Sequence, residues 1–123
     1  MDLATKPLKV TTPAQVHAAH HRIRDFAEQL LDADTAHNVH VMASEAMTNG
    51  IVHGHGSVTV TVSASPTSLR VEVRDDGPAL KVAGRVDHGR GLTLIDALAA
   101  RWDLTVDEAG TRLWFEVDRT GDS

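Results

Sequence analysis

The sequence of 123 residues contains no cysteine, which excludes disulfide bonds and zinc sites built on thiolates. It also contains no tyrosine, and aromatic residues make up only 3% of the chain. Valine, leucine, isoleucine and alanine must therefore supply most of the core. Hydrophobic residues at 41% and charged residues at 24% are ordinary values for a globular protein, so we expect a folded chain.

A surplus of positive charge is also missing. Lysine and arginine number 12 against 17 aspartates and glutamates, and the net charge is −5. Binding to nucleic acid needs a basic face to neutralise phosphates, so we expect no direct nucleic-acid partner. No apolar run is long enough to span a bilayer, and the N-terminus lacks the basic and apolar regions of a signal peptide. These features predict a cytoplasmic protein without a membrane segment.

Two helices are predicted in the first half of the chain. Thr12 and Pro13 are typical of an N-cap and a first helical position, so the first helix is expected over residues 13–31. A second helix is expected over residues 35–53, with Asp34 as its cap. The apolar residues that recur at helical spacing in the first helix are Val16, Ile23, Phe26, Ala27, Leu30 and Leu31.

The second half of the chain is dominated by short alternations of apolar and polar residues, which predict strands. A third helix is expected to begin at Gly89–Gly91 and to bury Leu92, Leu94, Ile95, Leu98 and Ala99. The expected strands are residues 8–10, 57–63, 69–74, 102–106 and 113–117. The last four of these form two hairpins, which indicates a mostly antiparallel sheet.

This order of elements predicts an α+β fold. We expect a two-layer sandwich, with a mostly antiparallel mixed sheet covered on one face by about three helices. The sequence has no internal repeat, linker or low-complexity segment. A single domain is therefore predicted over residues 1–123, with its core at about 8–118.

The stretch Ser44–Gly54 is the first candidate for chemistry. On a helix, residues four apart share a face, so Glu45, Asn49 and His53 form one stripe. An asparagine carbonyl suits Mg²⁺ bound to a phosphate chain, and a carboxylate one turn earlier can polarise an attacking water or hydroxyl. A solvated polar stripe on an ordinary amphipathic helix explains these residues equally well.

Three later segments also suit a nucleotide. Asp75 ends a strand, where its carboxylate can accept a hydrogen bond from an adenine amino group, and Gly77 lets a base approach closely. Gly89–Leu92 precedes a helix, so its amides can face an anion. The hydroxyl of Thr111, after Gly110, could reach a phosphate. Each segment has a plainer explanation as a turn or loop, and for the first and last of them the turn is the better one in isolation.

Taken in register, these segments resemble the GHKL ATPases. More narrowly, the chain is similar to small bacterial anti-sigma factor serine kinases and related single-domain ATP-binding regulators, over residues 8–118. The family boxes are Glu-x-x-x-Asn with a following Ala or Gly and a later His, Asp-x-Gly, Gly-Arg-Gly-Leu, and Gly-Thr. The matching residues are Glu45, Asn49, Gly50, His53, Asp75, Gly77, Gly89, Arg90, Gly91, Leu92, Gly110 and Thr111.

The resemblance implies a bound ATP with Mg²⁺ and a role for each box. Glu45 would be the general base, Asn49 the magnesium ligand, and Asp75 the anchor of the adenine. The resemblance places the other box residues around the nucleotide as well: His53, Gly77, Gly89, Arg90, Gly91, Leu92 and Thr111. For Arg90, a solvated loop position is an equally good explanation, and for His53 a structural role is as well supported as a catalytic one.

Two departures from the family pattern leave a second hypothesis open. Pro78 and Ala79 follow Gly77 where the family has a second glycine, and the segment between Gly77 and Gly89 is short for a lid. The first hypothesis is an ATP- and Mg²⁺-dependent regulator that binds a sigma factor, phosphorylates a serine on an anti-sigma antagonist, or does both, as a homodimer. The second is a partner-binding switch of the same fold with weak or no nucleotide binding.

The 8 histidines suggest a third hypothesis, a metal-binding protein. His17 and His21 are four residues apart, and His53 and His55 flank Gly54. No His-Glu-x-x-His pattern accompanies them. Solvated or titrating surface histidines explain the count better than a metal site.

Overall fold

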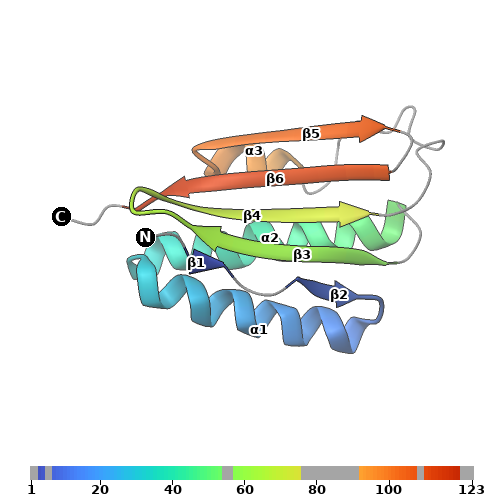
Figure 1. Cartoon of the computed structure of the whole chain (residues 1–123), viewed down its shortest axis with the longest axis horizontal. Helices are drawn as coiled ribbons and strands as arrows, with labels where there is room; N and C mark the ends of the chain where they lie inside the picture. Colours follow the sequence, from blue (N-terminus) through green and yellow to red (C-terminus); the bar gives the residue numbers. More distant parts are fainter. Residues whose placement is uncertain (1–2, 5–6, 54–56, 76–91, 108–109, 120–123) are drawn as a thin grey trace.

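The computed structural model describes residues 3–4, 7–53, 57–75, 92–107 and 110–119, and the structural statements below concern these residues. Within them, three helices lie on one side of a sheet (Figure 1). The helices are α1 (Pro13–Leu30), α2 (Ala33–His53) and α3 (Leu92–Leu98). The strands are β1 (Leu3–Ala4), β2 (Leu8–Val10), β3 (Val58–Ala64), β4 (Ser68–Asp75), β5 (Arg101–Asp107) and β6 (Gly110–Asp118).

The sheet has the strand order β1-β3-β4-β6-β5, and β2 also pairs with β3. Every described pair of strands is antiparallel. The two predicted hairpins, β3–β4 and β5–β6, are confirmed, and the pairing of β4 with β6 joins them. The predicted α+β sandwich is therefore confirmed. The short strand β1 was not expected, because two residues are too few to show a period.

The start of α1 agrees with the prediction from Thr12 and Pro13. The backbone nitrogen of Gln15 donates to Thr12 Oγ1 at 3.2 Å, and the backbone nitrogen of Thr12 donates to Gln15 Oε1 at 3.2 Å. This reciprocal pair is a capping box, and Pro13 occupies the first turn, where its missing N–H costs nothing. The helix ends at Leu30, one residue before the predicted end at Leu31.

The start of α2 differs from the prediction. The helix begins at Ala33, so Asp34 lies within its first turn and Asp32 directly precedes it, where its side chain caps the helix. The backbone nitrogen of Thr35 donates to Asp32 Oδ1 at 2.8 Å. This hydrogen bond favours the ionised carboxylate and lowers the pKa of Asp32. Both aspartates suit an N-cap, so the sequence alone did not distinguish between them.

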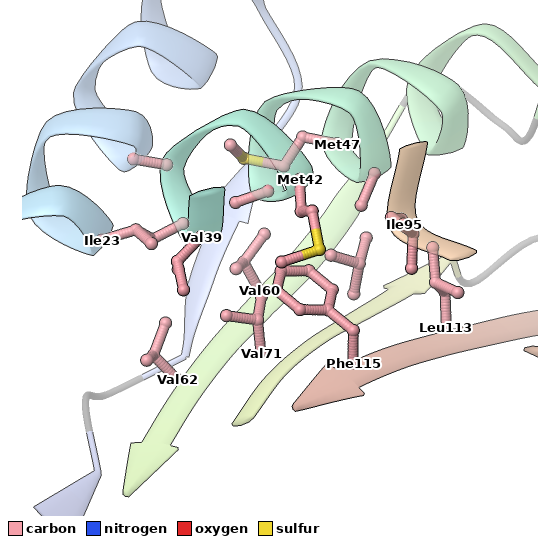
Figure 2. Packing of buried hydrophobic residues seen from close by; sticks show 14 of the residues in the cluster. Ile23, Val39, Met42, Met47, Val60, Val62, Val71, Ile95, Leu113 and Phe115 are labelled. Atoms are coloured by element: carbon pink, nitrogen blue, oxygen red, sulfur yellow. The ribbon is translucent and has the colours of Figure 1, made fainter. Parts of the chain in front are cut away.

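The core lies between the helices and one face of the sheet. The inward faces of β3, β4 and β6 are built from alternate apolar residues, as the period-two pattern predicted. In Figure 2, the Phe115 ring of β6 points toward Met42 of α2, and both side chains are fully buried. The largest fully buried side chains also include Ile23, Met47, Leu69 and Ile95.

Candidate functional site

The helix α2 presents a small, apolar stripe to the sheet and a polar stripe beside it. Met42 and Ala46 are buried, and Gly50 continues their stripe one turn later. On the neighbouring stripe, Glu45 is exposed and Asn49 is half-buried at the boundary between core and solvent. The helix therefore holds a carboxylate and an amide one turn apart, with the amide closer to the sheet.

A close contact fixes the distance between α2 and β3. A Cβ atom added to Gly50 would lie 2.5 Å from Val58 Cγ1, closer than real Cβ atoms approach other atoms. Val58 is fully buried at the first residue of β3. The absence of a side chain at Gly50 is what allows this approach, and it brings Asn49 close to this end of the sheet.

Val58, which contacts α2, belongs to a row of paired residues that crosses three strands of the sheet. Val58 pairs with Asp75 of β4, and Asp75 pairs with Thr111 of β6. The buried residues Val73 and Leu113 lie two positions away from Asp75 and Thr111, so strand alternation places both on the face that the helices cover. Asp75 and Thr111 are each half-buried. One row of the sheet thus extends from Val58, which contacts the C-terminal end of α2, to two of the predicted site residues.

Two of the other predicted site residues, Leu92 and His53, also lie within the described structure. Leu92 is the first residue of α3, and its side chain is buried in the core. His53 is the last residue of α2, and its side chain lies outside the description. Gly77, Gly89, Arg90 and Gly91 lie outside the described residues, as do Pro78 and Ala79.

A sequence model of the histidine kinase-like ATPase domain matches residues 10–117, which is most of the chain. The chain belongs to this family. The matched range includes the helix of Glu45 and Asn49 and the strands that carry Asp75 and Thr111. No protein of curated function matches the sequence.

A solved structure has the same overall fold as this histidine kinase-like ATPase domain. A chain in the crystal structure of the SiaB–SiaC complex from Pseudomonas aeruginosa is similar to it with a TM-score of 0.60 and 16% sequence identity. The similarity covers 95% of this chain and 88% of that chain. At this low identity, the structural similarity shows a shared fold and nothing more. Among the described residues of this domain, no helix has both the length and the apolar character needed to cross a membrane.

The donors on α2 fit a magnesium ion. Asn49 offers an amide oxygen, which is a type of ligand that Mg²⁺ accepts, and Glu45 one turn earlier offers a carboxylate that could accept a proton. Among the described residues, neither side chain makes a hydrogen bond or an ion pair. A half-buried asparagine whose amide oxygen has no partner among the described residues suits a ligand that arrives with a metal-bound phosphate.

A group of described histidines in this ATPase domain lies elsewhere, on α1 and the first half of α2. Arg24 Nη2 lies 3.3 Å from His21 Nδ1, and His21 Nε2 lies 3.2 Å from His17 Nε2. Because a guanidinium only donates, His21 accepts at Nδ1 and donates from Nε2 to His17. Among the described residues, no group of three side chains suits a metal ion.

His40 lies in the seam between the two helices. His20 Nε2 donates to the His40 carbonyl oxygen at 3.1 Å, and the two rings stack with centroids 3.7 Å apart. His40 Nδ1 is buried without a hydrogen-bond partner among the described residues. Burial lowers the pKa of His40, and the positive charges of His20, Arg24, His37 and His21 lower it further.

This arrangement predicts a loss of stability in mild acid. The folded-state pKa of His40 lies below its unfolded value of 6.5, so the unfolded chain binds the proton more readily. The free energy of unfolding should therefore fall as the pH drops from above 6.5 through the lowered pKa, and then level off. Urea unfolding at pH 7.5 and pH 5 would measure this. We expect His40→Gln to lose less stability over this interval than the wild type, and equal losses would contradict the assignment.

Proposed function

We propose that this chain is an ATP- and Mg²⁺-binding regulatory protein of bacterial transcription, of the anti-sigma factor type. The observation that carries the proposal is the meeting of two elements at one end of the sheet. There, the helix of Glu45 and Asn49 packs through Gly50 on the row that contains Asp75 and Thr111. Membership of an ATPase domain family supports a nucleotide at this place.

Each of these residues has a role in the proposal. Asn49 would hold the magnesium ion, which, when bound, supplies positive charge that stabilises the phosphates. Glu45, exposed on the next turn, would accept the proton of an attacking hydroxyl. Asp75 would accept a hydrogen bond from the adenine amino group. The Thr111 hydroxyl would donate a hydrogen bond to a phosphate oxygen. The segments Gly77 and Gly89–Gly91 belong to the same proposal through their sequence.

The proposed partners are proteins. The SiaB–SiaC structure is a complex of two proteins, and this supports partner binding by a chain of the same fold. We infer a sigma factor or an anti-sigma antagonist as the partner, with a serine of the antagonist as the phosphate acceptor. A homodimer, a single domain and a cytoplasmic location are further parts of this proposal.

A second candidate function is a partner-binding switch that does not transfer phosphate. Pro78 and Ala79, in place of an open glycine, favour it because both residues restrict the backbone more than glycine does. The two candidates share the fold and the partner surface. They differ in whether nucleotide binds and reacts.

Calorimetric titration with ATP and ADP, with and without Mg²⁺, tests the nucleotide site. We expect Mg²⁺-dependent binding of ATP that Asn49→Ala weakens by about 10–100-fold, because a contact to a charged group is lost. Thr48→Ala, at the exposed neighbouring position on α2, is the matched control and should bind as the wild type does. Absence of binding at millimolar nucleotide would refute the proposed enzyme and leave the switch. Equal binding by Asn49→Ala would refute the magnesium ligand.

A phosphorylation assay then distinguishes a kinase from a switch. With a purified antagonist protein and radiolabelled ATP, we expect Glu45→Ala to abolish phosphate transfer. The variant should still bind the antagonist, since its exposed side chain supports no described contact within the fold. Phosphate transfer at the wild-type rate by Glu45→Ala would rule out its role as the base.

A further inference from the structure

The face of the sheet opposite the helices carries charged residues. In Figure 1 the strands lie in front of α2. By strand alternation, the side chains of β4 and β6 that lie between the buried core residues point away from the helices. On these two central strands they include Arg70, Glu72, Arg74, Arg112, Trp114 and Glu116. No described helix covers this face, so its side chains are available to a partner.

One half of the open face is neutralised by its own ion pairs. Arg70 Nη1 lies 3.2 Å from Glu116 Oε2, and its guanidinium lies 4.1 Å from the centre of the Trp114 ring. Arg101 donates to Glu116 at 2.8 Å and to Asp118 at 2.7 Å. These two hydrogen bonds raise the pKa of Arg101. The arginines of this half are therefore balanced by carboxylates within the sheet.

In the other half, two arginines have no ion pair with a described carboxylate, although Glu72 and Asp103 lie in the next row on either side of Trp114. Arg74 and Arg112 are direct cross-strand partners, and both are exposed. Their neighbours in the same row are Thr59 of β3 and Thr105 of β5, which carry no charge. Among the described side chains, no carboxylate forms an ion pair with either arginine.

Such a pair is unfavourable for folding. Like charges directly opposite each other on neighbouring strands destabilise a sheet, whereas opposite charges at the same positions stabilise it. The chain as a whole is acidic, with a net charge of −5, so acidic residues are abundant elsewhere in the sequence. Features that weaken a fold without an evident structural gain are typical of functional sites.

We propose that the row Thr59–Arg74–Arg112–Thr105, with Trp114 beside it, is a docking surface for a carboxylate-rich segment of a partner protein. Two adjacent guanidinium groups can each bind a carboxylate through paired hydrogen bonds. The half-buried Trp114 ring offers apolar contact next to them. The proposal deepens the partner-binding part of the proposed function and is independent of nucleotide binding.

A binding experiment tests this surface directly. A fluorescein-labelled hexaglutamate peptide is titrated with the protein at low salt, and fluorescence anisotropy gives the affinity. We expect Arg74→Gln/Arg112→Gln to weaken binding by about tenfold or more. Lys9→Gln/Arg22→Gln removes two positive charges from exposed positions on β2 and α1, and should change binding less than about threefold. Equal losses in the two double variants would indicate a nonspecific charge effect and overturn the proposal.

Competition by phosphate and sedimentation distinguish an acidic peptide from other ligands of this face. Inorganic phosphate that displaces the peptide at equal charge concentration would indicate a small-anion site and overturn the proposal. Sedimentation of the wild type and of Arg74→Gln/Arg112→Gln tests for a second copy of the chain. A dimer that this double variant dissociates would assign the face to self-association instead. Loss of ATP binding has no bearing on any of these outcomes.

Thermal unfolding tests whether the two arginines are unbalanced in the free protein. Arg112→Glu places opposite charges across β4 and β6, so we expect the Tm to rise by about 2–4 °C. Arg101→Glu, which faces Glu116 and Asp118, should lower the Tm. A Tm that falls in Arg112→Glu would mean that Arg112 is already paired in the free protein, and it would overturn the proposal.

Discussion

Replacing Phe115 with alanine is expected to lower the free energy of unfolding by about 3–5 kcal/mol. Phe115 has no exposed surface, lies near the middle of β6, and points into the layer beneath α2 (Figure 2). The substitution removes buried apolar area and leaves a cavity that the surrounding core fills only partly. In a chain with only 3% aromatic residues, few other side chains are large enough to fill it.

Urea unfolding measures this loss, and the second phenylalanine supplies a matched control. The chain contains 2 phenylalanines, and Phe26 on α1 is only partly buried against the same core. Phe26→Ala should therefore cost clearly less than Phe115→Ala, because part of its ring is already in contact with water. Equal losses would contradict the central position that the structure gives to Phe115.

The sequence was informative wherever a local pattern determines the structure. The alternation around Val71 and Phe115 predicted both the strands and their inward faces, because a strand with one buried face must alternate. Thr12 and Pro13 predicted the start of α1, because the capping hydrogen bonds form within four residues. Such local patterns sufficed for the α+β class and for both hairpins.

Features that depend on contacts between distant segments could not be predicted in this way. The pairing of β4 with β6 joins two hairpins that are separated by α3, and no residue of either strand indicates that choice of neighbour. The opposition of Arg74 and Arg112 follows from the same pairing. Each arginine alone is an ordinary polar residue on an outward strand position.

The candidate site combines features that local sequence patterns predicted with features that depend on distant contacts. Glu45 and Asn49 could be placed on one helical face from their spacing, and Asp75 at a strand end from its flanking residues. The row that joins Val58, Asp75 and Thr111 required the sheet register. Family resemblance supplied the expectation that these residues belong together, and the roles assigned to them remain proposals.

Replacing Gly50 with alanine is expected to lower the free energy of unfolding by up to about 2 kcal/mol, although alanine favours helices. Overpacking a core typically costs about 1–3 kcal/mol, and the higher helix propensity of alanine returns about 1 kcal/mol. The obstacle is Val58 Cγ1, which would lie 2.5 Å from the added Cβ atom. Valine is β-branched, which restricts its χ1 angle, so this buried side chain cannot easily turn away.

A double-mutant cycle with Val58→Ala isolates this contact. Val58→Ala removes Cγ1, and the next atoms, Val58 Cβ and Val73 Cγ1, lie 3.8 Å from the added Cβ atom, an ordinary contact distance. In that background Gly50→Ala should therefore be neutral or stabilising by about 1 kcal/mol, which implies a coupling of about 2 kcal/mol between the two positions. Additive losses would mean that Gly50 is not required for the close approach of α2 to β3. If the proposed nucleotide site is correct, Gly50→Ala alone should also weaken ATP binding, because any shift of α2 moves Asn49 away from the row of Asp75 and Thr111.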